Sequence, residues 1–279
     1  MKWKGRRGSS NVQDRRGVGS KGIVGGGIGT IVLFVIILLM GGDPSQLIGN
    51  SSFIDPAPSQ YVESEEENEL AEFASVVLAE TETVWDYLFE KEGLQYQYPS
   101  LVLYKDSVQS ACGNATSAVG PFYCPGDNSV YIDLSFYEEL KQNFKAPGDF
   151  AFAYVIAHEV GHHVQNQLGI TDQVMRLRSR LSEKEFNQYM VRLELQADYY
   201  SGVWAHYVER ANLLERGDFQ EALNAASAVG DDRIQSESWG YVVPDKFTHG
   251  TSEQRAKWFN KGFESGTIQG GDTFNTNDL

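Results

Sequence analysis

Apolar positions recur at three- and four-residue intervals from residue 65 to about residue 92, which is the period of one face of an α-helix. Gly93 follows this pattern directly and is suited to end a helix, because glycine adopts the left-handed conformation without steric cost. We therefore expect a long amphipathic helix there. Its buried face would consist of Leu70, Phe73, Val77, Val84, Trp85, Leu88 and Phe89.

Two short segments, 99–108 and 129–134, are rich in β-branched and aromatic residues and are predicted to be strands. Helical periodicity dominates the rest of the second half of the chain. We expect helices at about 136–144, 149–168, 172–216, 218–229 and 251–264. The glycine-rich end of the chain is expected to be poorly ordered. This mixture predicts a helix-rich α+β fold with a small β-sheet.

A different pattern occupies the N-terminal region. Residues 22–40 form a run of nineteen residues without a charge, which is long enough to cross a bilayer as a helix. Basic residues precede this run and acidic residues follow it, so the positive-inside rule predicts a cytoplasmic N-terminus and an extracytoplasmic body. A cleaved signal peptide is the competing interpretation, but Leu39-Met40-Gly41 is not a small-x-small cleavage site. A buried core helix is a third interpretation, which the charge asymmetry disfavours.

These patterns divide the chain into four parts: a basic cytoplasmic tail (1–21), a transmembrane helix (22–40), a flexible linker rich in Gly, Pro and Ser (41–64) and a globular domain (65–279). The whole chain has a formal charge of −15, but the tail carries +6, so the remainder carries −21. A body this acidic would repel nucleic acid, which argues against a polynucleotide-binding function.

The chain has two cysteines, Cys112 and Cys124, in a region containing Gly, Asn and Pro. In an exported protein a disulfide between them is the natural expectation, and two free buried thiols are the alternative.

The helix predicted at 149–168 contains the sequence Ala157-His158-Glu159-Val160-Gly161-His162-His163. Positions four residues apart share one face of a helix, so His158 and His162 can offer nitrogens to one zinc ion, with Glu159 beside it. This H-E-x-x-H motif is short enough to occur by chance. Its meaning depends on a third ligand, because a catalytic zinc has three protein ligands and a fourth position for water.

Two known arrangements supply such a ligand. The metzincin motif is excluded, because Gln165 stands at the position of its glycine and Leu168 at the position of its last histidine. Glu194, followed by Asp198 four residues later, matches the thermolysin-like (gluzincin) arrangement. In that arrangement Glu194 would bind zinc, and Asp198 would accept the Nδ1 proton of a ligand histidine. The alternative is a solvated helix face, which the neighbouring apolar residues disfavour.

Zinc-activated water attacks a peptide carbonyl in this chemistry, and Glu159 is expected to act as the general base. The oxyanion needs a further donor, for which His249 and Tyr241 are the candidates. The alternative for His249 is a helix-capping or surface histidine. His163 and His206 are expected to be structural.

From about Val84 onwards the chain resembles the bacterial neutral zinc metallopeptidase family. The matching segments are Ser110-Ala111-Cys112-Gly113, Gly120-Pro121-Phe122-Tyr123-Cys124-Pro125, residues 157–165, Glu194-Leu195-Gln196-Ala197-Asp198 and Thr248-His249-Gly250-Thr251-Ser252. The resemblance implies a zinc peptidase with a zincin-like fold and a gluzincin-like ligand arrangement. It does not indicate the substrate. In related peptidases an edge strand binds the substrate backbone, and the strand at 129–134 is a candidate for that role, with ordinary sheet core as the alternative.

We therefore expect a membrane-anchored extracytoplasmic zinc metallopeptidase acting on protein or peptide substrates. Its cofactor would be Zn²⁺, bound by His158, His162 and Glu194. Two alternatives remain: a zinc-containing envelope scaffold or assembly factor with little turnover, and a hydrolase of a cell-wall amide.

Overall fold

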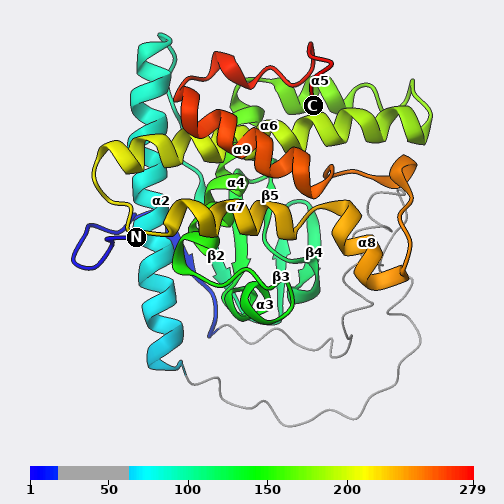
Figure 1. Ribbon diagram of the computed structural model, residues 1–279. Helices are drawn as coiled ribbons and strands as arrows, with labels where there is room; N and C mark the ends of the chain where they lie inside the picture. The colour runs from blue at the N-terminus through cyan, green and yellow to red at the C-terminus, as the bar shows by residue number, and fades with distance from the viewer. Residues whose placement is uncertain (18–62) are drawn as a thin grey trace.

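The protein is described by a computed structural model over residues 1–17 and 63–279, and helices dominate these ranges (Figure 1). The elements are β1 (Val12–Asp14), α2 (Glu65–Lys91), β2 (Ser100–Tyr104), β3 (Ser107–Ser110), β4 (Gly113–Thr116), η2 (Ser117–Val119), β5 (Phe122–Cys124), β6 (Ser129–Asp133), α3 (Phe136–Gln142), α4 (Asp149–Gln167), α5 (Ile170–Met175), α6 (Glu183–Arg210), α7 (Asp218–Ala228), α8 (Asp231–Trp239), η3 (Pro244–Lys246), α9 (Ser252–Ser265) and η4 (Gln269–Gly271). The predicted helix-rich α+β fold is confirmed.

The larger sheet has four strands in the order β1-β2-β6-β5. β1 and β6 both run parallel to β2, whereas β5 runs antiparallel to β6. The strand predicted at 129–134 is β6, an inner strand, so it cannot offer an edge to a substrate. The edge strand on that side is β5. A separate antiparallel hairpin, β3-β4, precedes it.

α2 forms where the sequence predicted it and stands along one side of the molecule (Figure 1). Ser64 caps its start, because the Ser64 side chain accepts from the amide of Glu67 and the Glu67 side chain accepts in return from the amide of Ser64. Trp85 is fully buried and packs edge-on against Tyr200 of α6. α2 thereby packs against α6, one of the two helices that carry the predicted zinc ligands.

α4 lies at the centre of the fold and contacts α2, α6 and α7. All of its residues from Phe150 to Gly161 are buried, which explains why its sequence is almost continuously apolar around the two histidines. At Gly161 the helix meets α6 so closely that a Cβ there would lie 2.9 Å from the carbonyl oxygen of Ala197. The two helices that bear the site are thus packed backbone to backbone.

α6 and α9 pack even more closely, and they cross the upper part of the view in Figure 1. A Cβ on Gly202 would overlap the carbonyl oxygen of Phe259, and one on Gly262 would overlap that of Tyr199. Two glycines therefore allow the backbones of these helices to touch.

Three predictions about the second half need correction. The helical region expected at 172–216 is broken into α5 and α6, because Ser182 and Glu185 form a capping box that starts a new helix. α8 was not predicted. The tail is folded against α6, where Arg192 donates to the carbonyl oxygens of Thr273 and Thr276.

The N-terminal residues belong to the same fold. β1 pairs with β2, and the ammonium group of Met1 lies 2.8 Å from Asp149 and 3.2 Å from Asp218, at the first residues of α4 and α7. Residues 1–17 therefore pack on the domain that was predicted to begin at residue 65, and the compartment of each part stays a prediction.

The transmembrane helix and the linker predicted at 22–40 and 41–64 lie almost entirely outside the described residues. Within residues 1–17 and 63–279, no helix is long and apolar enough to cross a membrane. The fold prediction is corrected accordingly: residues 1–17 and 63–279 form a helix-rich α+β domain, and no membrane helix is found among them.

Candidate active site

Three predicted ligands come together between α4 and α6. The ligand atoms of His158, His162 and Glu194 all lie within 4.8 Å of one another. The Glu194 carboxylate is 3.2 Å from Nε2 of His158 and 3.4 Å from Nε2 of His162. The i, i+4 spacing places both imidazoles on one face of α4, and α6 brings the carboxylate to that face.

Asp198 orients the first histidine. Nδ1 of His158 donates to the Asp198 carboxylate at 2.9 Å, so the neutral ring, which is the form that binds a metal, carries its lone pair on Nε2, and Nε2 faces Glu194. Asp198 is fully buried and also accepts from the hydroxyl of Tyr154 at 2.6 Å. The second-sphere role predicted for Asp198 agrees with this geometry.

Gln165 orients the second histidine, and the sequence did not indicate this role. Its amide nitrogen donates to the carbonyl oxygen of Leu193 at 2.6 Å, so its oxygen is the atom that accepts from Nδ1 of His162 at 2.8 Å. Nε2 of His162 is therefore left for a metal. The residue that excluded the metzincin motif thus has a structural reason to be glutamine.

Arg255 on α9 is the second functional residue that the sequence did not identify. It is buried and donates to Asp198 from Nε at 2.8 Å and from a terminal nitrogen at 3.0 Å. The same terminal nitrogen lies 3.4 Å from both ring nitrogens of His158. Because Arg255 stands 57 residues after Asp198, only the packing of α9 on α6 brings them together.

The electrostatics of the site favour a cation between the ligands. Burial alone would lower the pKa of His158, but the Asp198 carboxylate outweighs it and the pKa rises to about 9. Burial alone would raise the pKa of Glu194, yet His162 and His249 hold it well below its ordinary value. Glu194 is therefore ionised at neutral pH and available as a ligand.

A cavity of about 470 Å³ opens beside these residues. Glu159 lines it and is 8% exposed, so its carboxylate can reach a molecule bound next to the ligands. β5 forms one wall through Phe122 and Tyr123, and α3 and α8 contribute apolar residues to others. The cavity therefore combines an acid–base residue with a sheet edge.

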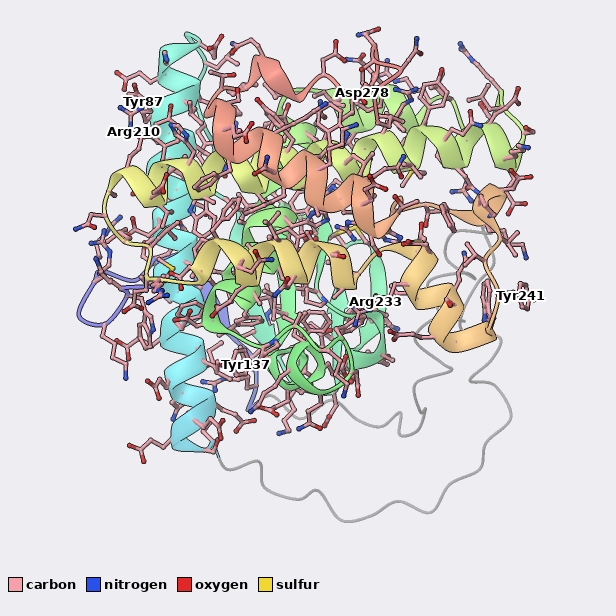
Figure 2. The ribbon with its side chains drawn as sticks, in the orientation of Figure 1. Tyr87, Tyr137, Arg210, Arg233, Tyr241 and Asp278 are labelled. Carbon is pink, nitrogen blue, oxygen red and sulfur yellow. A yellow bond between two sulfur atoms is a disulfide. The ribbon has the colours of Figure 1, made fainter. Side chains whose placement is uncertain are left out.

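His249 also lines this cavity, whereas Tyr241 is not among the residues that form its wall. The Asp231 carboxylate accepts from the backbone amide of His249 at 2.7 Å and lies 3.3 Å from its Nδ1. The cap of α9 is Thr251, so His249 is not a capping residue. Tyr241 is 63% exposed beside Trp239 and lies at the edge of the molecule in Figure 2. Of the two candidates, the structure places His249 at the site and Tyr241 away from it.

His163 and His206 serve the fold. Nδ1 of His163 lies 2.9 Å from the Tyr123 hydroxyl of β5, and its Nε2 lies 2.6 Å from the carbonyl oxygen of Gln97. Nδ1 of His206 lies 2.8 Å from the carbonyl oxygen of Phe263, which links α6 to α9. His163 thereby holds β5 against α4, the helix that carries the H-E-x-x-H motif.

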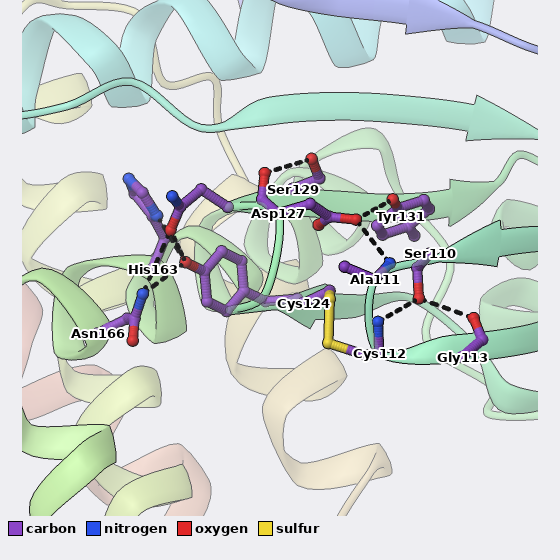
Figure 3. Close-up of a disulfide and its surroundings, with 12 residues drawn as sticks. Ser110, Ala111, Cys112, Gly113, Cys124, Asp127, Ser129, Tyr131, His163 and Asn166 are labelled. Carbon is purple, nitrogen blue, oxygen red and sulfur yellow. Dashed lines mark hydrogen bonds between the residues drawn. A yellow bond between two sulfur atoms is a disulfide. The ribbon is translucent and has the colours of Figure 1, made fainter.

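The predicted disulfide between Cys112 and Cys124 is present (Figure 3). It links the turn of the β3-β4 hairpin to the last residue of β5, and His163 and Asn166 of α4 lie beside that strand. The cavity wall formed by β5 is therefore anchored covalently to the hairpin and by hydrogen bonds to α4.

The donor set fits zinc. Two imidazole nitrogens and one carboxylate oxygen are typical ligands of a catalytic zinc, and hydrogen bonds at both Nδ1 atoms fix the tautomers that binding requires. The cavity next to them would leave a position for water or substrate. Asp149, Asp218 and Glu221 form a second cluster of carboxylates, and two of them, Asp149 and Asp218, form ion pairs with the ammonium group of Met1.

Comparisons with known proteins agree with this geometry. Residues 1–274 match the family described as "putative neutral zinc metallopeptidase". The chain is 48% identical over 275 residues to protein YpfJ of Escherichia coli K12, covering 95% of this chain and 96% of that protein. It is 43% identical over 195 residues to Mb2605 of Mycobacterium bovis and to Rv2575 of Mycobacterium tuberculosis H37Rv, covering 66% of this chain and 65% of each relative.

The names of these relatives state no activity, and no solved structure matches the chain significantly. The family match nonetheless covers nearly the whole sequence, from the N-terminal strand to the tail that packs on α6. The chain therefore belongs to the neutral zinc metallopeptidase family.

Proposed function

We propose that the protein is a peptidase that hydrolyses peptide bonds in the cavity between α4, β5 and α8. His158, His162 and Glu194 would hold a zinc ion, and Glu159 would be the general base. The observation that carries this proposal is the convergence of three oriented ligands within 4.8 Å, beside a cavity that Glu159 lines.

Zinc, when bound, supplies Lewis-acid chemistry and lowers the pKa of water towards about 7. Glu159 takes a proton from the attacking water and passes it to the amine that leaves when the peptide bond breaks. Burial alone would lower the pKa of His249, but Glu194 and Asp231 outweigh it and raise the pKa, which favours the ring with a proton on each nitrogen. With its Nδ1 side held by Asp231, the protonated His249 would donate from Nε2 to the oxyanion that develops on the carbonyl. Asp198, Gln165 and Arg255 keep the ligands in place.

β5 would bind the substrate backbone. It is an edge strand that lines the cavity, so an extended peptide can pair with it and extend the sheet. This arrangement supports a linear or unfolded peptide as substrate, because a folded chain would not offer a free strand.

We also propose that the protein works in an oxidising compartment outside the cytoplasm. The disulfide between Cys112 and Cys124 supports this location, because such bonds persist mainly where thiols are not kept reduced. The N-terminal strand would lie in the same compartment as the rest of the fold.

The decisive variant is Glu159→Gln, which keeps the shape of the side chain and removes its basicity. We expect peptide hydrolysis to fall by about 10²–10⁴-fold, while metal analysis still finds one zinc per chain. Glu90→Gln, at an exposed position of α2, is the matched control and should retain full activity.

Three substrates separate the candidate functions: unfolded casein, quenched fluorescent peptides and peptidoglycan fragments. Chelator-sensitive cleavage of casein or peptides supports the proposal, and cleavage of peptidoglycan alone would identify a cell-wall amidase. A zinc-loaded protein that cleaves none of them would identify a scaffold.

A further inference from the structure

The cavity contains two charged side chains that the proposed chemistry does not use. Its charged residues are Glu139, Glu159, Glu194, Asp231, Lys246 and Arg255. Glu194 and Glu159 belong to the reaction, Asp231 holds His249, and Arg255 holds Asp198. Glu139 and Lys246 remain.

Glu139 lies on α3, within an apolar wall of the cavity. The ring centroids of Phe136 and Phe144, which also line the cavity, are 6.1 Å apart, and a Cβ on Gly120 would lie 3.6 Å from the Phe136 ring. Glu139 is half-buried, and burial, followed by the nearby Asp133, raises the pKa of its carboxyl group. Its carboxylate has thus lost hydration without gaining a counter-charge.

The neighbouring cations have other hydrogen-bond partners. Lys141 on the same helix pairs with Glu138 at 3.3 Å. Arg233 of α8 pairs with Glu237 at 3.0 Å and donates to the carbonyl oxygen of Phe144 at 3.0 Å. Among the residues that the structure describes, no salt bridge or side-chain hydrogen bond to Glu139 is found.

Lys246 lies on the far side of the metal site. α4 and α6 are antiparallel, because Asp198 meets His158 whereas Leu193 meets Gln165. α3 packs on the first half of α4, where Tyr137 contacts Phe152. η3, which carries Lys246, instead packs near the start of α6, where Asn187 donates to the carbonyl oxygen of Asp245. Lys246 therefore does not neutralise Glu139.

We propose that Glu139 determines specificity by receiving a lysine or arginine side chain of the substrate, next to the bond that is cleaved. The pocket formed by Phe136, Phe144, Val155 and Ile234 would pack on the aliphatic part of that side chain, and Glu139 would pair with its cationic end. This inference rests on the proposed peptidase function. Beyond residue 21 the chain carries a charge of −21, which would also attract cationic substrates.

The test uses the full-length Glu159→Gln chain, which should bind peptides without cleaving them. Two fluorescent peptides differ at one position, which is lysine in one and norleucine in the other, placed in turn on each side of the target bond. Norleucine keeps the four-carbon stem and lacks the charge. We expect the lysine peptide to bind about tenfold more tightly on one of the two sides, as a pair of opposite charges at a partly buried site would give.

Adding Glu139→Gln should abolish this preference, and adding Glu139→Lys should reverse it in favour of a glutamate peptide. Glu138→Gln is the matched control, because Glu138 is the preceding residue but does not line the cavity, and it should keep the preference. Circular dichroism checks that each variant folds.

Two negative outcomes remain distinguishable. Peptide binding and hydrolysis without a lysine preference, or a preference that survives Glu139→Gln, would overturn the inference and leave the peptidase function intact. Absence of both binding and hydrolysis for all peptides would overturn the peptidase function and the inference together.

Discussion

Three side chains donate hydrogen bonds to Asp198, and these bonds connect the proposed metal ligands to α9, the last long helix. His158, Tyr154 and Arg255 all donate to its buried carboxylate. Burial would raise the pKa of Asp198, but Arg255 and His158 outweigh it and lower the pKa. The carboxylate therefore stays charged, and it can hold the His158 ring in the orientation that metal binding needs.

Arg255→Lys should weaken zinc binding by about 10–100-fold, which is the usual cost of losing an outer-shell partner of a metal ligand. A lysine keeps the charge but cannot make the two parallel hydrogen bonds that Arg255 makes to Asp198. Competition with a zinc chelator measures the affinity. Arg210→Lys, at the exposed end of α6, is the control. Equal zinc affinities for wild type and Arg255→Lys would contradict the proposed positioning role.

His163 should make stability depend on pH. Burial lowers its pKa to about 4, against 6.5 in the unfolded chain, so between these values the unfolded chain binds the extra proton. The free energy of unfolding should therefore rise with pH from about 4 to 6.5, and His163 should account for about 3 kcal/mol of that rise.

Urea unfolding of wild type and His163→Asn across pH 4–7 measures this contribution. The difference between the two proteins should grow with pH up to about 6.5 and then stay constant. A difference that is already constant below pH 6 would show that His163 does not titrate in this way.

The residues of the proposed metal site divide into those that a sequence pattern can identify and those that only the fold brings to the site. His158, Glu159, His162, Glu194 and Asp198 occur at helical spacings, so their relation to a metal was predictable. In the sequence, Gln165 was noted only because it departs from the metzincin motif. No motif near Arg255 indicated its role. Tyr241 was a poor candidate because its side chain is exposed away from the cavity, and the sequence around a single aromatic residue does not show whether its side chain is exposed.

Among the elements, the contact between α4 and α6 controls the spacing of the ligands. His158 and His162 lie on α4 and Glu194 lies on α6. Any change in the distance between the axes of these helices therefore changes the distances between the ligand atoms. Gly161 sets that distance because its Cα is packed against the backbone of Ala197.

Gly161→Ala should destabilise the protein and reduce its zinc affinity. Alanine favours a helix over glycine by about 1 kcal/mol, but its Cβ would lie 2.9 Å from a backbone oxygen that cannot move freely. We expect a net loss of about 1–3 kcal/mol in the free energy of unfolding, typical of overpacking. Thermal unfolding and chelator competition provide the measurements.

Gly17→Ala is the control, because no atom lies within 4 Å of a Cβ at that position. A Gly161→Ala variant that matches wild type in both measurements would show that α4 and α6 can separate without cost.

Elements with strong periodicity and local caps were predicted well, and elements defined by tertiary contacts were not. α2, β6, α4 and α7 form close to their expected positions. The break before α6 depends on a capping box inside a continuous helical pattern, and β1 has three residues whose place depends on pairing with β2. Short strands and interrupted helices carry too little periodicity to be identified alone.

At the scale of the whole molecule, the disulfide should contribute measurably to stability. Cys112 and Cys124 are 12 residues apart, so the bond restricts a short loop of the unfolded chain and should add about 2–3 kcal/mol. Urea unfolding with and without a reductant tests this. The double variant Cys112→Ser with Cys124→Ser should be less stable than wild type and insensitive to the reductant. Equal stability of oxidised and reduced wild type would contradict the prediction.

The close packing of α6 and α9 also determines when during synthesis a working site can exist. Domains begin to fold as the chain emerges from the ribosome, N-terminal parts first. The segment 252–265 emerges long after both histidines and Glu194, yet it carries Arg255, the counter-ion of the Asp198 that orients His158. Until α9 docks against Gly202, Asp198 can contact Tyr154 and His158 but lacks the guanidinium group of Arg255. The nascent chain therefore reaches this point with the three proposed metal ligands already synthesised, before Arg255 can hold Asp198 and, through it, His158 in place.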